Sequence, residues 1–358
     1  MIAIKSELRI LIDKRGRRLR GYKAVVENDE LIIYLDEEFY EPQVYQYFYK
    51  SESSRRIQET LFHEKQLLIE NCLFGVDINP KSVMICRLRL WIELLKNMYY
   101  TKASNYTRLE TLPNIDINIK VGNSLVYQFD LNDDYKKLPA NVKQKIRMAT
   151  QKYKEQVFLY KNTSDKITKG IIEANIEKLK QSFKDISQST DSIYLQKKKK
   201  EKELGETPIT FTKEERVAWR RKAIQLAKDI KRLEQQYQEK VDTLYSNSLE
   251  WRFEFPEVLD ENGNFVGFDL VVGNPPYIRQ EKLDAELKHF YLKKFGNVGT
   301  GTADIYVYFF GLALQIAKPN NFIHFITLNK WLKTKYGKTL RTALAKQNVL
   351  EIIDFFEL

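Results

Sequence analysis

Phe268-Asp269-Leu270-Val271-Val272-Gly273-Asn274-Pro275-Pro276-Tyr277 begins as a valine-rich apolar run and ends in a proline turn. The apolar run, bounded by Gly273, is typical of a fully buried strand in a parallel sheet. Two consecutive prolines cannot extend that strand, because each lacks a backbone donor and has a fixed φ. We therefore expect a rigid polar turn just past the carboxyl end of a strand, where open α/β sheets bind ligands.

The turn offers two hydrogen-bond acceptors and one aromatic face. The acceptors are the side-chain oxygen of Asn274 and the backbone carbonyl of Pro275. Together they suit a planar amine with two N–H bonds, and accepting both bonds makes that nitrogen a better nucleophile. Tyr277 adds a flat ring on which a base can stack. The alternative is a plain proline turn with an Asn cap, but the apolar run before it and the aromatic after it favour a catalytic motif.

This motif resembles the catalytic motif of S-adenosylmethionine-dependent amino-methyltransferases, most often adenine-specific DNA methyltransferases. Ile69-Glu70-Asn71-Cys72-Leu73-Phe74-Gly75-Val76-Asp77-Ile78-Asn79-Pro80 resembles the family's second cofactor strand. The following helix, through Leu88-Arg89-Leu90-Trp91, resembles the large restriction–modification branch of Type II enzymes. The resemblance covers most of the chain outside its middle third. It implies an α/β fold with a partial Rossmann-like sheet, S-adenosylmethionine as the cofactor and double-stranded DNA as the substrate.

The resemblance also assigns roles to single residues. The acid at the end of the second strand of such folds accepts hydrogen bonds from ribose hydroxyls, so Asp77 and the adjacent Ile78 are expected to bind the cofactor. Asn123, after a predicted third strand at 115–121, either contacts the cofactor's adenine or belongs to a plain turn. The catalytic residues are Asn274, Pro275, Pro276 and Tyr277, and the DNA or target-base contacts are Arg279, Lys330 and Trp331.

Composition limits the class of protein. The 358 residues carry a net charge of +11, so an acidic polymer is a plausible partner, although ordinary lysine-rich composition gives the same charge. Cys72 and Cys86 stand in apolar contexts and are expected to be reduced core residues of a cytoplasmic protein. No signal peptide and no apolar run of membrane-spanning length is present. Three scattered histidines and no Cys-x-x-Cys pair argue against a metal site.

Four parts are predicted along the chain: a hairpin-containing segment at 1–50, a cofactor-side half at 51–135, a basic helical insertion at 136–250 and a catalytic half at 251–358. Residues 141–250 hold 25 Lys and Arg against 16 Asp and Glu, a net of +9. Apolar residues recur there at helical spacing, which predicts a coiled-coil-like antiparallel hairpin or small bundle with an exposed linker at 187–207. This insertion either grips DNA or a partner, or is a helical insertion with a solvated face.

Further elements follow from periodicity and turn signals. Helices are predicted at 53–70, 81–96 and 303–317, and His324 is expected in the core. Strands are predicted at 22–26, 31–35, 72–78, 322–327 and 349–356, with an Asn262-Gly263 turn before the catalytic strand.

Two parts of the family pattern are missing from the sequence. Relatives carry a glycine-rich turn that binds the methionine end of the cofactor before the position of Asp77, but residues 1–75 contain no strand followed by Gly-x-Gly. They also carry a target-recognition domain after a segment like 349–358. We therefore expect a fragment that needs an upstream polypeptide with the glycine motif and a separate target-recognition domain.

The leading hypothesis is a site-specific, adenine-specific DNA methyltransferase of a Type II restriction–modification system, which flips its target base out of the duplex. A second hypothesis is methylation of another planar amine, on an RNA base or a protein glutamine. A third is an inactive fragment that only binds DNA or complements a partner chain.

Overall fold

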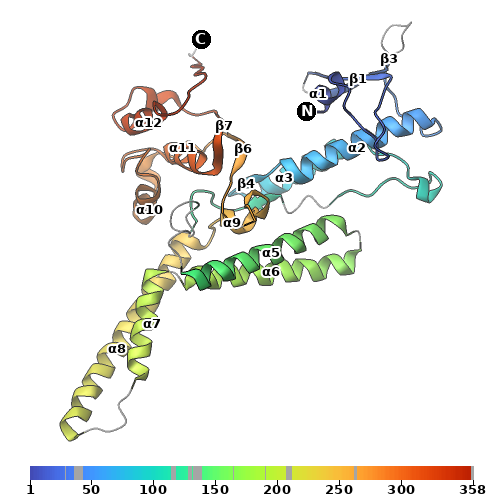
Figure 1. Cartoon of the computed structure of the whole chain (residues 1–358). Coiled ribbons are helices and arrows are strands. Elements are labelled where there is room, and N and C mark those ends of the chain that lie inside the picture. The colour runs from blue at the N-terminus through green and yellow to red at the C-terminus, as the bar shows by residue number, and fades with distance from the viewer. Residues whose placement is uncertain are drawn as a thin grey trace. The chain divides into compact units, whose positions relative to one another are not determined.

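A computed structural model of the chain describes residues 1–28, 30–35, 43–113, 118–127, 131, 139–163, 165–189, 191–206, 212–261 and 264–355 (Figure 1). Their contacts divide them into two units. The first contains Met1–Val121 and Val157–Ile172, and the second contains Gly122–Gln156 and Glu173–Leu358. Asp77 therefore belongs to the first unit, whereas Asn123 and the Asn-Pro-Pro-Tyr turn belong to the second.

The first unit begins with a helix and an antiparallel hairpin. The elements are α1 (Ile2–Glu7), β1 (Tyr22–Glu27), β2 (Glu30–Leu35) and the short β3 (Gln43–Val44). Tyr22 pairs with Leu35 and Glu27 with Glu30, which confirms the two strands predicted at 22–26 and 31–35. Asp29, in the predicted turn, lies outside the described residues.

A strand–helix–strand unit follows, with its two strands parallel. It consists of α2 (Glu52–Cys72), β4 (Gly75–Asp77), α3 (Pro80–Leu95), η1 (Lys102–Ser104) and β5 (Ile119–Val121). Gly75 pairs with Ile119, and Asp77 pairs with Val121. The helices predicted at 53–70 and 81–96 are confirmed. The predicted strands at 72–78 and 115–121 form only at 75–77 and 119–121, and residues 114–117 lie outside the described residues.

The two cysteines are not core residues, contrary to the prediction. Cys72 is exposed and Cys86 is partly buried. The reason is that α2 continues through Cys72, which places this side chain in the last helical turn instead of inside a strand.

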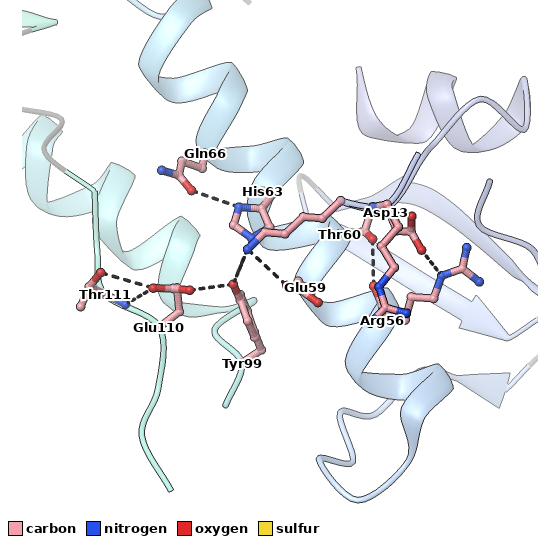
Figure 2. Close-up of polar contacts among 11 residues, drawn as sticks. Asp13, Arg56, Glu59, Thr60, His63, Gln66, Tyr99, Glu110 and Thr111 are labelled. Carbon is pink, nitrogen blue, oxygen red and sulfur yellow. Dashed lines mark hydrogen bonds and ion pairs between the residues drawn. The ribbon is translucent and has the colours of Figure 1, made fainter. Parts of the chain in front are cut away.

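A polar cluster around Tyr99 ties α2 to the segment that follows α3 (Figure 2). The Tyr99 hydroxyl donates to Glu110 Oε2 at 2.8 Å and lies 3.0 Å from His63 Nε2 and 3.2 Å from Lys14 Nζ. Burial, reinforced by Glu110, raises the pKa of Tyr99 well above its usual value, so the hydroxyl remains a donor. Burial and the nearby Lys14 cation lower the pKa of His63. Each polar group of this half-buried cluster thereby has a partner.

Four long helices form the predicted insertion in the middle of the chain: α5 (Ala140–Asn162), α6 (Lys166–Gln188), α7 (Ser192–Gly205) and α8 (Lys213–Lys240), which runs into a π-helical turn, η2 (Val241–Tyr245). The α5 and α6 helices pack through Tyr153 and Phe183, whose ring centroids are 6.4 Å apart. The α7 and α8 helices lie side by side (Figure 1). The prediction of amphipathic helices packed as hairpins is confirmed.

The prediction of an exposed linker at 187–207 is wrong, because most of this segment is α7. Asp191 caps this helix by accepting from the backbone N–H groups of Ile193 and Tyr194. Two lysines of this segment form ion pairs with α8: Lys197 with Glu234 at 2.6 Å and Lys200 with Asp229 at 2.9 Å. A run of like charges becomes a stable helix when the partner helix supplies the opposite charges.

The last part of the chain, which was predicted to be the catalytic half, contains a second parallel pair of strands. Its elements are α9 (Trp251–Glu254), η3 (Pro256–Val258), β6 (Phe268–Gly273), η4 (Gln280–Lys282), α10 (Ala285–Phe295), α11 (Ile305–Ile316) and β7 (Ala317–Phe325). Val272 pairs with His324 and Gly273 with Phe325. The predicted helix at 303–317 and strand at 322–327 are confirmed, with the strand starting earlier and ending at Phe325. The Asn262-Gly263 turn lies outside the described residues.

The expectation that the catalytic strand is fully buried is wrong. Val272 is 70% exposed and Leu270 is 53% exposed. Among the described residues β6 pairs with β7 alone, and Leu270 and Val272, two residues apart and therefore on one face of β6, are both exposed. His324, which pairs with Val272, is also exposed and is not a core residue.

The chain continues through η5 (Asn329–Leu332) and α12 (Gly337–Leu344) without a final strand. The strand predicted at 349–356 does not form over 349–355, and Phe356 lies outside the described residues. Leu350 and Ile353 are exposed. A strand requires a neighbour that takes up its backbone hydrogen bonds, and no described strand pairs with this segment.

Small parallel strand pairs with intervening helices support the α/β class. A single Rossmann-like sheet is not formed by the described residues, which hold three separate small sheets. In the part of the chain that the structure describes, no helix has both the length and the apolar character needed to cross a bilayer.

Candidate functional site

Gly273 ends β6 where only a residue without a side chain fits. A Cβ at this position would lie 2.8 Å from Cε1 of the Phe325 ring. The Gly273 carbonyl accepts from the backbone N–H of Ile326 at 3.0 Å, so the turn starts directly at the paired end of the strand. The Phe325 ring packs in turn on Phe310, with centroids 5.1 Å apart. The position of the following turn is therefore fixed by close packing.

The turn holds Asn274 and Tyr277 together. The Tyr277 hydroxyl donates to Asn274 Oδ1 at 2.9 Å. Pro275 is buried, whereas Asn274 and Pro276 are exposed and Tyr277 is 49% exposed. Sequence reasoning missed this hydrogen bond, which occupies one of the two lone pairs of the Asn274 oxygen and leaves the other available. The predicted acceptor and the predicted stacking ring thus form one unit that faces solvent.

An open hollow lies beside this unit. Its volume is about 360 Å³, and it is lined by Tyr277, Ile278, Arg279 and Lys282. This size falls within the range of roughly 300–1,000 Å³ that small-molecule sites occupy. Two of its four lining residues are cationic, so it favours an anionic or electron-rich ligand. The structure therefore brings Arg279, a predicted DNA contact, next to Tyr277.

Asp304 anchors the loop that follows the turn. Its Oδ1 accepts from the backbone N–H of Gln280 at 3.0 Å, and its Oδ2 accepts from the Tyr336 hydroxyl at 3.3 Å. The backbone N–H of Ile305 donates to the Ile278 carbonyl at 3.1 Å. The sequence indicated only that Asp304 opens α11. Its real partners, 24 and 32 residues away, could not be found from local signals.

Lys330 and Trp331 lie in η5, after β7. Lys330 is exposed, but Trp331 is only 8% exposed and packs on Phe310 with ring centroids 5.8 Å apart. Arg341 donates to the Trp331 carbonyl and holds this turn. The indole therefore contacts the protein interior in this structure, and its predicted contact with a flipped base stays a prediction.

The predicted cofactor residues lie at strand ends. Asp77 is exposed at the end of β4, and its Oδ1 accepts from the Asn79 backbone N–H at 2.7 Å. Ile78 beside it is 60% exposed. The Asn123 side-chain oxygen accepts from the Leu125 backbone N–H at 3.1 Å, and its side chain also hydrogen-bonds to Tyr291. Asp77 is thus open to a ligand, whereas Asn123 is engaged within its own turn.

Comparison with known proteins finds relatives of one kind. Residues 71–358 match the sequence profile of the Eco57I restriction-modification methylase family. A stretch of 80 residues is 39% identical to the Type II methyltransferase M.XhoI of Xanthomonas vasicola and covers 22% of this chain and 14% of that protein. M.PaeR7I, a Type II methyltransferase of Pseudomonas aeruginosa, is 35% identical over 85 residues, or 24% of this chain and 15% of that protein.

A third relative is described as a putative type II restriction enzyme and methyltransferase, RM.MjaORFECS2P of Methanocaldococcus jannaschii. It is 40% identical over 77 residues, which are 22% of this chain and 6% of that protein. The matched stretches thus span less than a fifth of each of these three relatives. No solved structure shows a significant match to the chain.

Proposed function

The chain belongs to the Eco57I restriction-modification methylase family, and from that premise we propose that it methylates the exocyclic amino group of adenine in DNA with S-adenosylmethionine as the donor. The observation that carries this proposal is the Asn274–Tyr277 unit at the end of β6. It joins the Asn274 side-chain oxygen to an exposed ring, and that ring lines a hollow with two cationic side chains. The Type II methyltransferase names of the relatives agree with DNA as the substrate.

Each residue of the turn has a defined role in this proposal. Adenine inside a duplex cannot be reached, so the base flips into the site and stacks on the Tyr277 ring. Asn274 Oδ1 and the Pro275 carbonyl accept the two amino N–H bonds, which raises the electron density on the nitrogen. Tyr277, by donating to Asn274 Oδ1, fixes the amide with its free lone pair toward the base. Pro276 keeps the turn rigid.

S-adenosylmethionine, when bound, supplies the electrophilic methyl group. The exposed Asp77 carboxylate at the end of β4 would accept hydrogen bonds from its ribose hydroxyls, with Ile78 packing beside it. Asn123 would have to release its hydrogen bond with the Leu125 backbone N–H to contact the adenine of the cofactor. For this reason Asp77 is the stronger candidate.

Contacts with DNA are proposed for the cations next to the turn. Arg279 and Lys330 are exposed and carry charge that fits phosphate oxygens. Trp331 would hold the flipped base only after its ring leaves Phe310.

Exposed apolar side chains in each unit support the proposal that a second polypeptide binds this chain. In the first unit Met84 and Leu88 on α3 are exposed, and in the second unit Leu270 and Val272 on β6 are exposed. Exposed apolar side chains that share one face of a helix or strand often mark a surface that a partner covers. A polypeptide that carries the expected central strand and glycine-rich turn would cover it. Co-expression with such a polypeptide should raise soluble yield and S-adenosylmethionine affinity, and no change in either quantity would refute the requirement.

Replacement of Asn274 tests the proposed chemistry. Asn274→Ala removes an acceptor used mainly in the transition state, so turnover should fall by roughly 10²–10³-fold, by analogy with the loss of one oxyanion-hole donor. The measurement is transfer of labelled methyl groups to DNA, RNA and protein substrates separately, with cofactor binding followed in parallel. Asn321→Ala, at an exposed position on β7, is the matched control and should be fully active. Turnover of Asn274→Ala close to that of the control would refute the assignment.

A further inference from the structure

We propose that the outward face of α8 is a second DNA-contact surface, which holds the phosphate backbone through Arg216, Arg220, Arg221, Lys228 and Lys231. The proposal rests on DNA being the substrate of the family's chemistry. It concerns the helical insertion, which contributes no residue to the turn at the end of β6.

The inner face of α8 is fully used in packing. Leu226 and Leu233 are buried, and Tyr237 lies against Tyr194 of α7 with ring centroids 5.8 Å apart. Asp229, near the same side, binds Lys200 of α7. These contacts fix the rotation of α8 and decide which of its side chains face α7.

The five cations lie on the opposite side of the helix. All five are exposed. At about 100° per residue they fall within an arc of roughly 140°, and the buried leucines lie outside this arc, on the opposite side. Along the axis they extend over about 22 Å, which is enough to follow several phosphates of a duplex. Two single aliphatic side chains, Val217 and Ile224, share the arc but are too few to make an apolar docking surface.

The charge on this arc is not needed to hold the hairpin together. Lysines that face the partner helix are neutralised: Lys197 with Glu234 at 2.6 Å, and Lys222 with Glu203 at 2.6 Å. By contrast, none of the five outward cations has an acidic partner among the described residues. The only acid between Arg216 and Lys231 is Asp229, which is turned toward α7. An ordinary solvated helix face mixes both signs, whereas a stripe of one sign fits a polyanion.

The base of the hairpin is joined to the element that follows the catalytic turn. In η2, the Thr243 hydroxyl lies 2.8 Å from Glu286 Oε2 of α10, and the Tyr245 and Phe290 rings meet edge to face at 6.4 Å. From the same helix α10, Lys288 Nζ donates to Gln280 Oε1 at 3.1 Å. DNA held on α8 is therefore mechanically linked, through α10, to the loop after Tyr277.

A pair of matched double variants of the full chain tests the proposal. One variant, Arg220→Gln with Lys228→Gln, removes two charges from the outward stripe. The control, Lys198→Gln with Lys202→Gln, removes two charges that are also exposed and that pair with Glu201 of α7 and with Glu206 directly after it. Fluorescence anisotropy measures binding to a non-specific duplex over a range of salt concentrations, and circular dichroism confirms that both variants keep the helices.

Each phosphate contact contributes about 0.9 to the slope of log K against log salt, so the stripe variant should lower this slope by about 1.8. The control should leave the slope unchanged. An unchanged slope in the stripe variant, an equal drop in both variants, or a loss confined to RNA or anionic vesicles would overturn the proposal. Asn274→Ala should bind the non-specific duplex like the wild type. If no methyl transfer is detected but the stripe variant still has a lower salt slope than the control, the proposed function is refuted and the proposed DNA-contact surface on α8 is not.

Discussion

The hydroxyl and the ring of Tyr277 can be tested separately, because the structure gives each a different contact. The hydroxyl donates to Asn274 Oδ1 at 2.9 Å, and the side chain is 49% exposed. A neutral hydrogen bond contributes about 0.5–1.5 kcal/mol net, and water competes for this one. Tyr277→Phe should therefore cost about 0.5–1 kcal/mol, or a two- to five-fold loss in kcat/KM.

Tyr277→Ala removes the ring as well. Stacking of a base on an aromatic side chain is worth about 1–3 kcal/mol, which corresponds to a further loss of roughly 5- to 150-fold. Because the ring is half exposed and lies outside the packed core, this change should leave the free energy of unfolding almost unaltered. The two variants thus separate orientation of the acceptor from binding of the base.

The assay is methyl transfer from labelled S-adenosylmethionine to duplex DNA, with kcat and KM measured for the wild type and both variants. Urea unfolding shows that the variants are folded. The reasoning is refuted if Tyr277→Phe is as impaired as Tyr277→Ala, since the hydroxyl would then carry the function. Near wild-type kinetics for Tyr277→Ala would remove the base-stacking role altogether.

Three further outcomes are expected. Asp77→Ala should weaken S-adenosylmethionine binding in calorimetry without changing DNA affinity, because its carboxylate is exposed after β4; an equal loss of both would indicate misfolding. Gly273→Ala should reduce the free energy of unfolding by about 1–3 kcal/mol, since its Cβ would meet the Phe325 ring at 2.8 Å, and an unchanged urea midpoint would contradict this packing. Burial and Lys14 lower the pKa of His63 from 6.5, so the unfolded chain binds the proton more tightly. Stability contributed by neutral His63 is therefore present above about pH 6.5 and lost as the pH falls toward the lowered value. His63→Gln should flatten that part of the pH–stability profile, and identical profiles would exclude the effect.

Local sequence signals were sufficient for most helices and for the catalytic turn. The helices predicted at 53–70, 81–96 and 303–317 correspond to α2, α3 and α11, because helical periodicity and caps act within a few residues. The Asn-Pro-Pro-Tyr turn follows from proline chemistry alone. That Asn274 and Pro275 act as paired acceptors stays a prediction.

The burial of side chains, and their contacts with residues far along the chain, could not be predicted from local sequence in the same way. The apolar composition of β6 predicted a buried strand, but burial depends on whether other elements cover both faces, and Val272 is exposed. An exposed linker was predicted at 187–207, yet most of it is α7, and Lys197 and Lys200 of this helix pair with acids on α8. Asp304 is the N-cap residue of α11, and no local signal indicated that its carboxylate also holds the backbone N–H of Gln280, 24 residues away.

The amino-acid sequence alone therefore specified the chemistry that this protein can offer: a rigid turn with two acceptors and an aromatic ring after an apolar strand. Only the tertiary structure decided that Tyr277 donates to Asn274 and that Trp331 packs inward. It also decided that one basic face of α8 has no acidic partner within the described part of the chain. The physical reason is the distance along the chain over which each kind of interaction acts. Backbone propensities and proline geometry act over a few residues, whereas ion pairing, ring packing and exposure depend on residues that only the fold brings into contact.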